Sequence, residues 1–214
     1  MKKLFLTTLL LFIGFSAFAQ SAYEKVMADK IAKIDQCKTY DEFTALSNDF
    51  SRIGDKEKTQ WLPYYYAAFS TIKGGRILMM DKKADGLDTA GDAAINYITK
   101  AEALSPDTAE LSILSKMAHG LKMMVDPMSR YMTEGQAAQK ALDAAIKKDP
   151  NNPRIAILQA EDLYFTPEQF GGDKKKAKET FQKAKEFFKT YKPKTSLDPN
   201  WGEGEADYFL SQMN

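Results

Sequence analysis

Small and apolar residues recur in one pattern that occurs three times: alanine, three residues, a large apolar residue, two residues, alanine. Spacings of four and three residues place all three side chains on one face of an α-helix. Because this face is small at both ends, a second helix can approach it closely. The pattern predicts three helices packed through this face. Its copies are Ala94-Ile98-Ala101, Ala138-Leu142-Ala145 and Ala177-Phe181-Ala184.

The similarity between the first two copies extends beyond the pattern. They start 44 residues apart, and the same offset relates Pro106 to Pro150 and Leu114 to Leu158. The third copy follows after a further 39 residues. Self-similarity at a period of roughly 30 to 50 residues is typical of helical repeat arrays, in which each hairpin buries its apolar side against its neighbours. We therefore expect an all-α chain.

The order of these residues resembles the second helix of a tetratricopeptide (TPR) repeat. Pro106 and Pro150 follow the last alanine of their copies by five residues, as in that family, whereas the third copy has Lys189 at this place. The resemblance implies a degenerate TPR-like helix-hairpin array, an α-solenoid. The loop 170–173, Phe-Gly-Gly-Asp, also resembles the periplasmic TPR subunit of some TRAP transporters.

Two further helices are predicted ahead of the repeats. The first spans residues 22–36, and the second begins with a capping box formed by Thr39 and Glu42. Gly54 is placed to end this second helix. The hairpin lacks the repeated pattern, so we expect it to cap the array. Its expected buried residues are Tyr23, Met27, Ile31, Ile34, Phe43, Leu46, Phe50 and Ile53.

Turn signals place the remaining helices. One starts near Trp61, carries Pro63 in its first turn, and either breaks or crosses a neighbour closely at Gly74-Gly75. Others are expected at residues 109–125, 132–147, 154–165, from 174 onward and 201–213. The predicted organisation is a signal peptide at 1–19 and one TPR-like domain at 20–214. Within it, 20–60 form the N-terminal hairpin cap, 61–106, 107–150 and 151–193 the three repeats, and 194–214 a C-terminal capping segment.

The first nineteen residues are typical of a secretory signal peptide. Lys2 and Lys3 precede an apolar stretch, and Ala17-Phe18-Ala19 is an A-x-A cleavage signal. About 15 apolar residues are fewer than the roughly 20 that span a bilayer. We expect cleavage after Ala19, no stable membrane insertion afterwards, and a periplasmic or secreted protein.

Charge and cysteine content narrow the classes of partner. Removing Lys2 and Lys3 from the 30 basic residues leaves 28 against 29 acidic ones, so nucleic acid is not an expected partner. The single cysteine, Cys37, forms no internal disulfide.

Candidate chemistry is sparse. His119 is the only histidine, no catalytic set can be assembled around it, and no metal or phosphate-binding motif occurs. We therefore expect a non-enzymatic protein without cofactor or metal. Seven of the ten methionines fall between residues 79 and 132, which suits core packing, a ligand-contacting patch or a cuprous-copper site. Nine lysines between residues 173 and 194 are interpreted as a solvated outer surface, although an anionic partner would also fit.

The TPR resemblance implies a protein-binding scaffold of the bacterial cell envelope, with the first helix of each repeat lining a concave groove. The alternative is a small-molecule-binding accessory subunit of a periplasmic transport system. Arg154 and Tyr164 are expected to be exposed anchors for a protein or peptide partner. The complete set of predicted contact residues is Tyr65, Tyr66, Glu110, Ile113, Met117, Arg154, Ile157, Glu161 and Tyr164.

Overall fold

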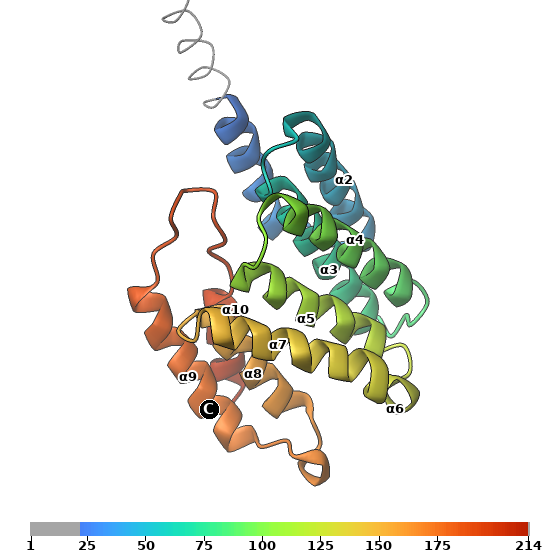
Figure 1. The fold of residues 1–214 in the computed structure, drawn as a ribbon. Helices are drawn as coiled ribbons and strands as arrows, with labels where there is room; N and C mark the ends of the chain where they lie inside the picture. The colour runs from blue at the N-terminus through green and yellow to red at the C-terminus, as the bar shows by residue number, and fades with distance from the viewer. Residues whose placement is uncertain (1–21, 214) are drawn as a thin grey trace, which may run out of the picture.

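A computed structural model describes residues 22–213, so the predicted signal peptide lies outside the described part of the chain. The described residues form helices and connecting turns and contain no β-strand. From α2 to α7, helices that follow each other in the chain pack as neighbours, and α8 and α9 form a further hairpin that meets α7 only sparsely (Figure 1). The predicted all-α helix-hairpin array is thus confirmed. None of the helices within residues 22–213 has the length and apolar content needed to cross a membrane.

The N-terminal hairpin pairs a helix at residues 22–31 and a short 3-10 turn, η1 (Ile34–Gln36), with α2 (Tyr40–Glu57). The predicted capping box is present: the Glu42 amide donates to the Thr39 hydroxyl, and the Thr39 amide donates to the Glu42 carboxylate. These two bonds satisfy amides that a helix start leaves unpaired. They fix where α2 begins.

Gly54 does not end α2, contrary to the sequence-based expectation. The helix continues to Glu57 and ends at Lys58, which adopts a left-handed conformation with φ of 58°. Gly54 instead makes room for the ring of Tyr64, since a Cβ at this position would lie 2.8 Å from two of its ring carbons. The glycine serves packing between helices.

Three hairpins follow: α3 (Leu62–Met80) with α4 (Leu87–Leu104), α5 (Ala109–Met123) with α7 (Gln136–Lys148), and α8 (Pro153–Phe165) with α9 (Lys174–Thr190). The repeated pattern lies in α4, α7 and α9, and all nine of its side chains are buried, which confirms the predicted face. The helix α3 runs through Gly74-Gly75 without a break. A Cβ on Gly75 would meet Leu121 at 2.6 Å, so this pair permits close crossing.

The connection from α5 to α7 differs from the expected turn. A short helix, α6 (Pro127–Arg130), is followed by a π-helical turn, η2 (Tyr131–Gly135), and α7 starts four residues later than predicted. Asp126 caps α6 by accepting from the Ser129 amide. Arg130 donates to the Asp88 carboxylate at the start of α4, which ties this connection to the preceding hairpin.

The C-terminal segment lies across the array as well as along its end. The helix α10 (Glu203–Gln212) packs on α9, where the rings of Phe209 and Phe181 stack 4.9 Å apart. The preceding stretch, residues 191–202, extends toward the N-terminal hairpin (Figure 1) and buries Leu197 in the main core. A second, smaller core joins α8, α9 and α10. The final segment thus links both ends of the fold.

Candidate functional site

A buried ion pair joins the first helices of two neighbouring hairpins. The Nε atom of Arg154 in α8 donates to both carboxylate oxygens of Glu110 in α5, at 3.0 and 3.1 Å, and its Nη2 atom donates at 2.5 Å. The Arg154 side chain is fully buried. Burial alone would lower the pKa of Arg154, but the charge of Glu110 and these hydrogen bonds raise it above its ordinary value. The guanidinium therefore stays charged.

Helix caps place the two partners opposite each other. Thr108 accepts from the Leu111 amide at the start of α5, which puts Glu110 in the first turn, where an acidic side chain is favoured. Asn152 accepts from the Arg154 amide and also donates to Glu110 at 2.7 Å. The same asparagine thus starts α8 and binds the carboxylate that pairs with it.

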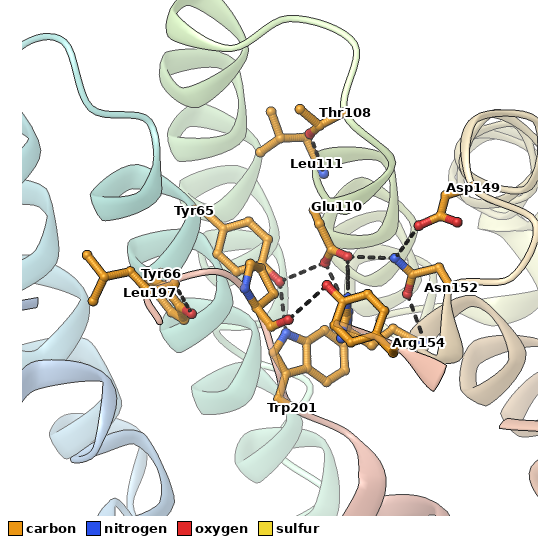
Figure 2. A network of polar contacts seen from close by, with 12 residues as sticks. Tyr65, Tyr66, Thr108, Glu110, Leu111, Asp149, Asn152, Arg154, Leu197 and Trp201 are labelled. Carbon is orange, nitrogen blue, oxygen red and sulfur yellow. Dashed lines mark hydrogen bonds and ion pairs between the residues drawn. The ribbon is translucent and has the colours of Figure 1, made fainter. Parts of the chain in front are cut away.

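Aromatic side chains enclose this pair (Figure 2). The Tyr65 hydroxyl donates to Glu110 at 3.2 Å and accepts from Trp201 Nε1 at 2.8 Å. The rings of Tyr191 and Trp201 lie 4.5 and 5.7 Å from the Arg154 guanidinium carbon. These cation–π contacts occur beside its Nη1 atom, which is buried without a hydrogen-bond partner among the described residues. Burial and the charge of Glu110 raise the pKa of Tyr65.

The network holds the C-terminal segment against the face formed by α3, α5 and α8. The Tyr66 hydroxyl donates to the Leu197 carbonyl at 2.7 Å (Figure 2). The ring centroids of Phe69 and Trp201 lie 4.6 Å apart in a stacked arrangement. The expected open groove is therefore covered, at this place, by the chain itself. Trp201, expected at the start of the C-terminal capping helix, instead lies ahead of α10 and packs on Phe69 of α3. Burying its indole against these aromatic rings explains the difference.

The structure brings together four of the nine predicted contact residues: Tyr65, Tyr66, Glu110 and Arg154. They form a closed network and no open surface. The expectation that Arg154 is an exposed anchor is wrong, because its charge is neutralised internally by Glu110. Two isoleucines, Ile113 and Ile157, are fully buried in the two cores.

The remaining three predicted residues lie apart from this network. Met117 is buried in the main core, and Tyr164 is partly exposed at the end of α8. Glu161 accepts from Arg76 Nη2 at 2.7 Å, and Arg76 Nη1 donates to Glu205 of α10 at 2.5 Å. Burial, with a smaller contribution from the charge of Glu205, raises the pKa of Glu161 to about 7, although Arg76 opposes this shift.

Sequence reasoning missed the residues that close the network, Tyr191, Leu197 and Trp201. Leu197 lies between two predicted helices, in residues 192–200, which carry Pro193 and Pro199, whereas Trp201 was expected to begin the helix at 201–213. Leu197 and Trp201 themselves were the available signal. Large apolar side chains in a connecting segment are usually buried, which predicts that this segment packs against the helices.

A cleft of about 530 Å³ opens beside the network, between the N-terminal hairpin, α3 and residues 196–205. We call it the C-terminal cleft. Its apolar lining comes from Ile31, Ile34, Tyr66, Phe69 and Trp201. Its charged lining consists of Lys73 and four carboxylates, those of Asp35, Asp198, Glu203 and Glu205. Arg76 and Lys185 neutralise two of these carboxylates, and the excess of negative charge disfavours an anionic ligand here.

A second cavity, of about 460 Å³, lies where α8 passes into the loop before α9. Tyr164 and Phe165 form its aromatic side, and the loop residues from Thr166 to Lys174 complete it. Lys174 Nζ lies 5.6 Å from the centre of the Tyr164 ring. Its charged lining is Lys174 together with Glu168 and Asp173, so this cavity combines exposed aromatic surface with one lysine.

The methionine-rich region is divided between the interior and one exposed edge. Met117 is buried, whereas Met80, Met128 and Met132 are exposed. His119 Nδ1 lies 2.6 Å from a Glu134 carboxylate oxygen. Within residues 22–213, no cluster of three or more histidine, cysteine, aspartate or glutamate side chains is arranged to hold a metal ion.

Comparison with known proteins identifies a related solved structure. No protein-family model matches the chain, so TPR membership rests on resemblance alone. No curated protein matches it either. Among solved structures, the HusA haemophore from Porphyromonas gingivalis has 32% sequence identity and a TM-score of 0.77, with 89% of this chain and 92% of that chain covered. Identity at this level over nearly the full length of both chains shows common descent, and the protein belongs to the same family as the HusA haemophore.

Proposed function

We propose that this protein is an exported carrier that binds haem or a closely related porphyrin. The observation that carries the proposal is the similarity to the HusA haemophore across 89% of the chain. The sequence supports export, because residues 1–19 are typical of a signal peptide. The function is thus closer to the small-molecule alternative than to a protein scaffold.

The chemistry of the described residues supports this choice. A porphyrin offers a flat apolar ring for stacking and carboxylates for pairing with cations, and the second cavity presents aromatic rings beside lysine. Both cavities fall within the range of roughly 300 to 1,000 Å³ that is usual for small-molecule sites. The covered face between α3, α5 and α8 leaves less of the concave surface open to a protein partner.

A haem titration of the mature chain tests the proposal. We expect a saturable shift of the Soret absorbance at one haem per chain, with a Kd of about 1 µM or below, equivalent to roughly 8 kcal/mol of binding free energy. Non-saturating uptake that follows haem concentration linearly would contradict specific binding.

Native mass spectrometry of protein isolated from its own cells provides an independent measurement. We expect the mass of a bound tetrapyrrole on part of the population. Protein that carries no small molecule, retains a stoichiometric protein partner and fails the haem titration would support the scaffold hypothesis instead.

A further inference from the structure

We propose that the porphyrin lies on a surface formed by Tyr164 and Phe165 of α8 and Tyr208 of α10, with Lys174 and Lys175 pairing with its carboxylates. We call the three aromatic residues the aromatic ledge. This inference rests on the proposed function and assigns it to a place on the chain.

Exposure is the first observation. The Phe165 side chain is 66% exposed and Tyr208 is 60% exposed, although each lies next to a buried core. Both rings border the same residue, Phe209. Exposed apolar side chains gathered at one place on a protein surface mark a binding site. An aromatic ligand that covers both rings would remove that surface from water.

The ledge is preformed. The rings of Tyr164, Phe165 and Tyr208 all contact Phe209, at centroid distances of 5.3, 5.7 and 5.5 Å. Phe209 itself stacks on Phe181, with the two ring planes only 11° apart. The exposed rings thus rest on a buried, ordered layer, and helices α8, α9 and α10 lie together there (Figure 1). A ligand pays little ordering entropy when the surface is already arranged.

The adjoining loop is also fixed in place. The Asp173 amide donates to the Leu163 carbonyl at 2.9 Å, and the Gly172 amide donates to the Pro167 carbonyl at 3.2 Å. Any Cβ at Gly172 would lie 1.7 Å from the Thr166 carbonyl oxygen, so the backbone passes too close for another residue. These contacts hold the wall of the second cavity beside Tyr164 and Phe165.

Charge favours this cavity over the C-terminal cleft for a dicarboxylate. Lys174, Lys175 and Lys176 are exposed at the start of α9. The nearby acidic residues are Glu168 and Asp173, and Asp173 is engaged as the helix cap, accepting from the Lys176 amide at 2.9 Å. Lys176 also pairs with Asp173 at 3.5 Å, which leaves Lys174 facing Glu168 in the cavity lining. In the cleft, Arg76 and Lys185 pair with Glu205 and Glu203, which leaves Asp35 and Asp198 against Lys73. Opposite charge raises the rate of association and favours the matching ligand over others.

The test compares exposed aromatic pairs at two places. We expect Phe165→Ala combined with Tyr208→Ala to raise the Kd for haem at least tenfold while the melting temperature stays close to that of the native protein. The matched control is Met128→Ala combined with Tyr131→Ala, a similarly exposed pair at the α6–η2 connection, which should leave the Kd unchanged. Haem binding lost in the control pair and retained in the ledge pair would overturn the assignment.

Charge variants supply a second measurement on the same site. Lys174→Glu should raise the Kd, and Glu168→Gln should lower it, because the latter removes a carboxylate from the cavity lining. Both effects should vanish with a porphyrin dimethyl ester, which lacks the negative charges. If the substitutions change the Kd equally with the ester, the lysines do not pair with the porphyrin carboxylates.

The two levels of the hypothesis fail differently. If the native protein does not bind haem, both the proposed function and the assignment of the aromatic ledge are wrong. If the native protein binds haem and the ledge pair binds equally well, only the ledge assignment falls. A Kd raised by Ile31→Ala and not by the ledge pair would move the site to the C-terminal cleft.

Discussion

Trp201 Nε1 donates a hydrogen bond to the Tyr65 hydroxyl at 2.8 Å, joining residues that are 136 positions apart. The same hydroxyl donates to Glu110, which pairs with Arg154. One continuous network therefore connects the C-terminal segment to α3, α5 and α8. Because most of these side chains are buried, substituting them should lower the free energy of unfolding.

Replacing Arg154 with alanine should destabilise the protein by about 3–5 kcal/mol, because it leaves the Glu110 carboxylate buried without its partner. Chemical denaturation measures this loss. Lys175→Ala, at an exposed position of α9, is the control and should change stability by less than about 0.5 kcal/mol. An unchanged denaturation midpoint for Arg154→Ala would mean that the ion pair is not formed in solution.

Trp201→Ala should free residues 191–200 while α10 stays folded. The substitution removes both the stacking on Phe69 and the bond to Tyr65, whereas α10 is held separately by Phe209 and Phe181. We expect a loss of about 3 kcal/mol and faster hydrogen exchange confined to that stretch. Trp201→Phe keeps a ring on Phe69, so it should cost about 1 kcal/mol. Equal loss of protection in α10 would show that the segment and helix unfold together.

Ala177→Leu should destabilise the protein by about 1–3 kcal/mol, because Ala177 is fully buried in α9, which packs against α8, and three further carbons would overpack this face. Thermal denaturation measures the change. Lys175→Leu, two residues earlier and exposed, adds a similar apolar side chain without overpacking. Similar melting temperatures for both variants would contradict the close-packed face.

Stability should fall as the pH rises from about 4.5 to 7. Burial raises the pKa of Glu161 to about 7 from an ordinary value of 4.5, so the folded protein retains a proton that the unfolded chain releases. The stabilisation is fully present below pH 4.5 and is lost as the pH passes 7. The free energy of unfolding should change by on the order of 1–3 kcal/mol over this pH range, and Glu161→Gln should remove that change. Urea denaturation at several pH values measures both. The same slope in both proteins would show that Glu161 titrates normally.

Glu205 responds in the opposite direction and provides an internal check. Its pKa is lowered because the Arg76 charge and the hydrogen bonds outweigh its burial, so its contribution is lost only as the pH falls below the ordinary range for glutamate. Glu161 is the more buried carboxylate of the two, at 9% side-chain exposure against 23%. Burial therefore outweighs the charge of Arg76 at Glu161, whereas the Arg76 charge and the hydrogen bonds together outweigh burial at Glu205.

The sequence by itself determined the helices and the face through which they pack. The Thr39–Glu42 cap and the Ala94-Ile98-Ala101 face depend on residues at most seven positions apart, and helix geometry alone fixes their relation. For the same reason, Pro63 was correctly placed in a first helical turn. Local hydrogen bonds and helical periodicity need no knowledge of the rest of the chain.

Tertiary structure decided what the local pattern left ambiguous. Gly54 has the features of a helix end, yet the approach of the Tyr64 ring gives it a different role. Arg154 and Tyr164 share one predicted helix face, but burial beside Glu110 makes the first a structural residue, while the second remains at the surface. Trp201 lies ahead of α10 and stacks on Phe69 of α3. These outcomes depend on contacts between residues far apart in the sequence, whose energies come from desolvation and packing and are set only when the helices have assembled.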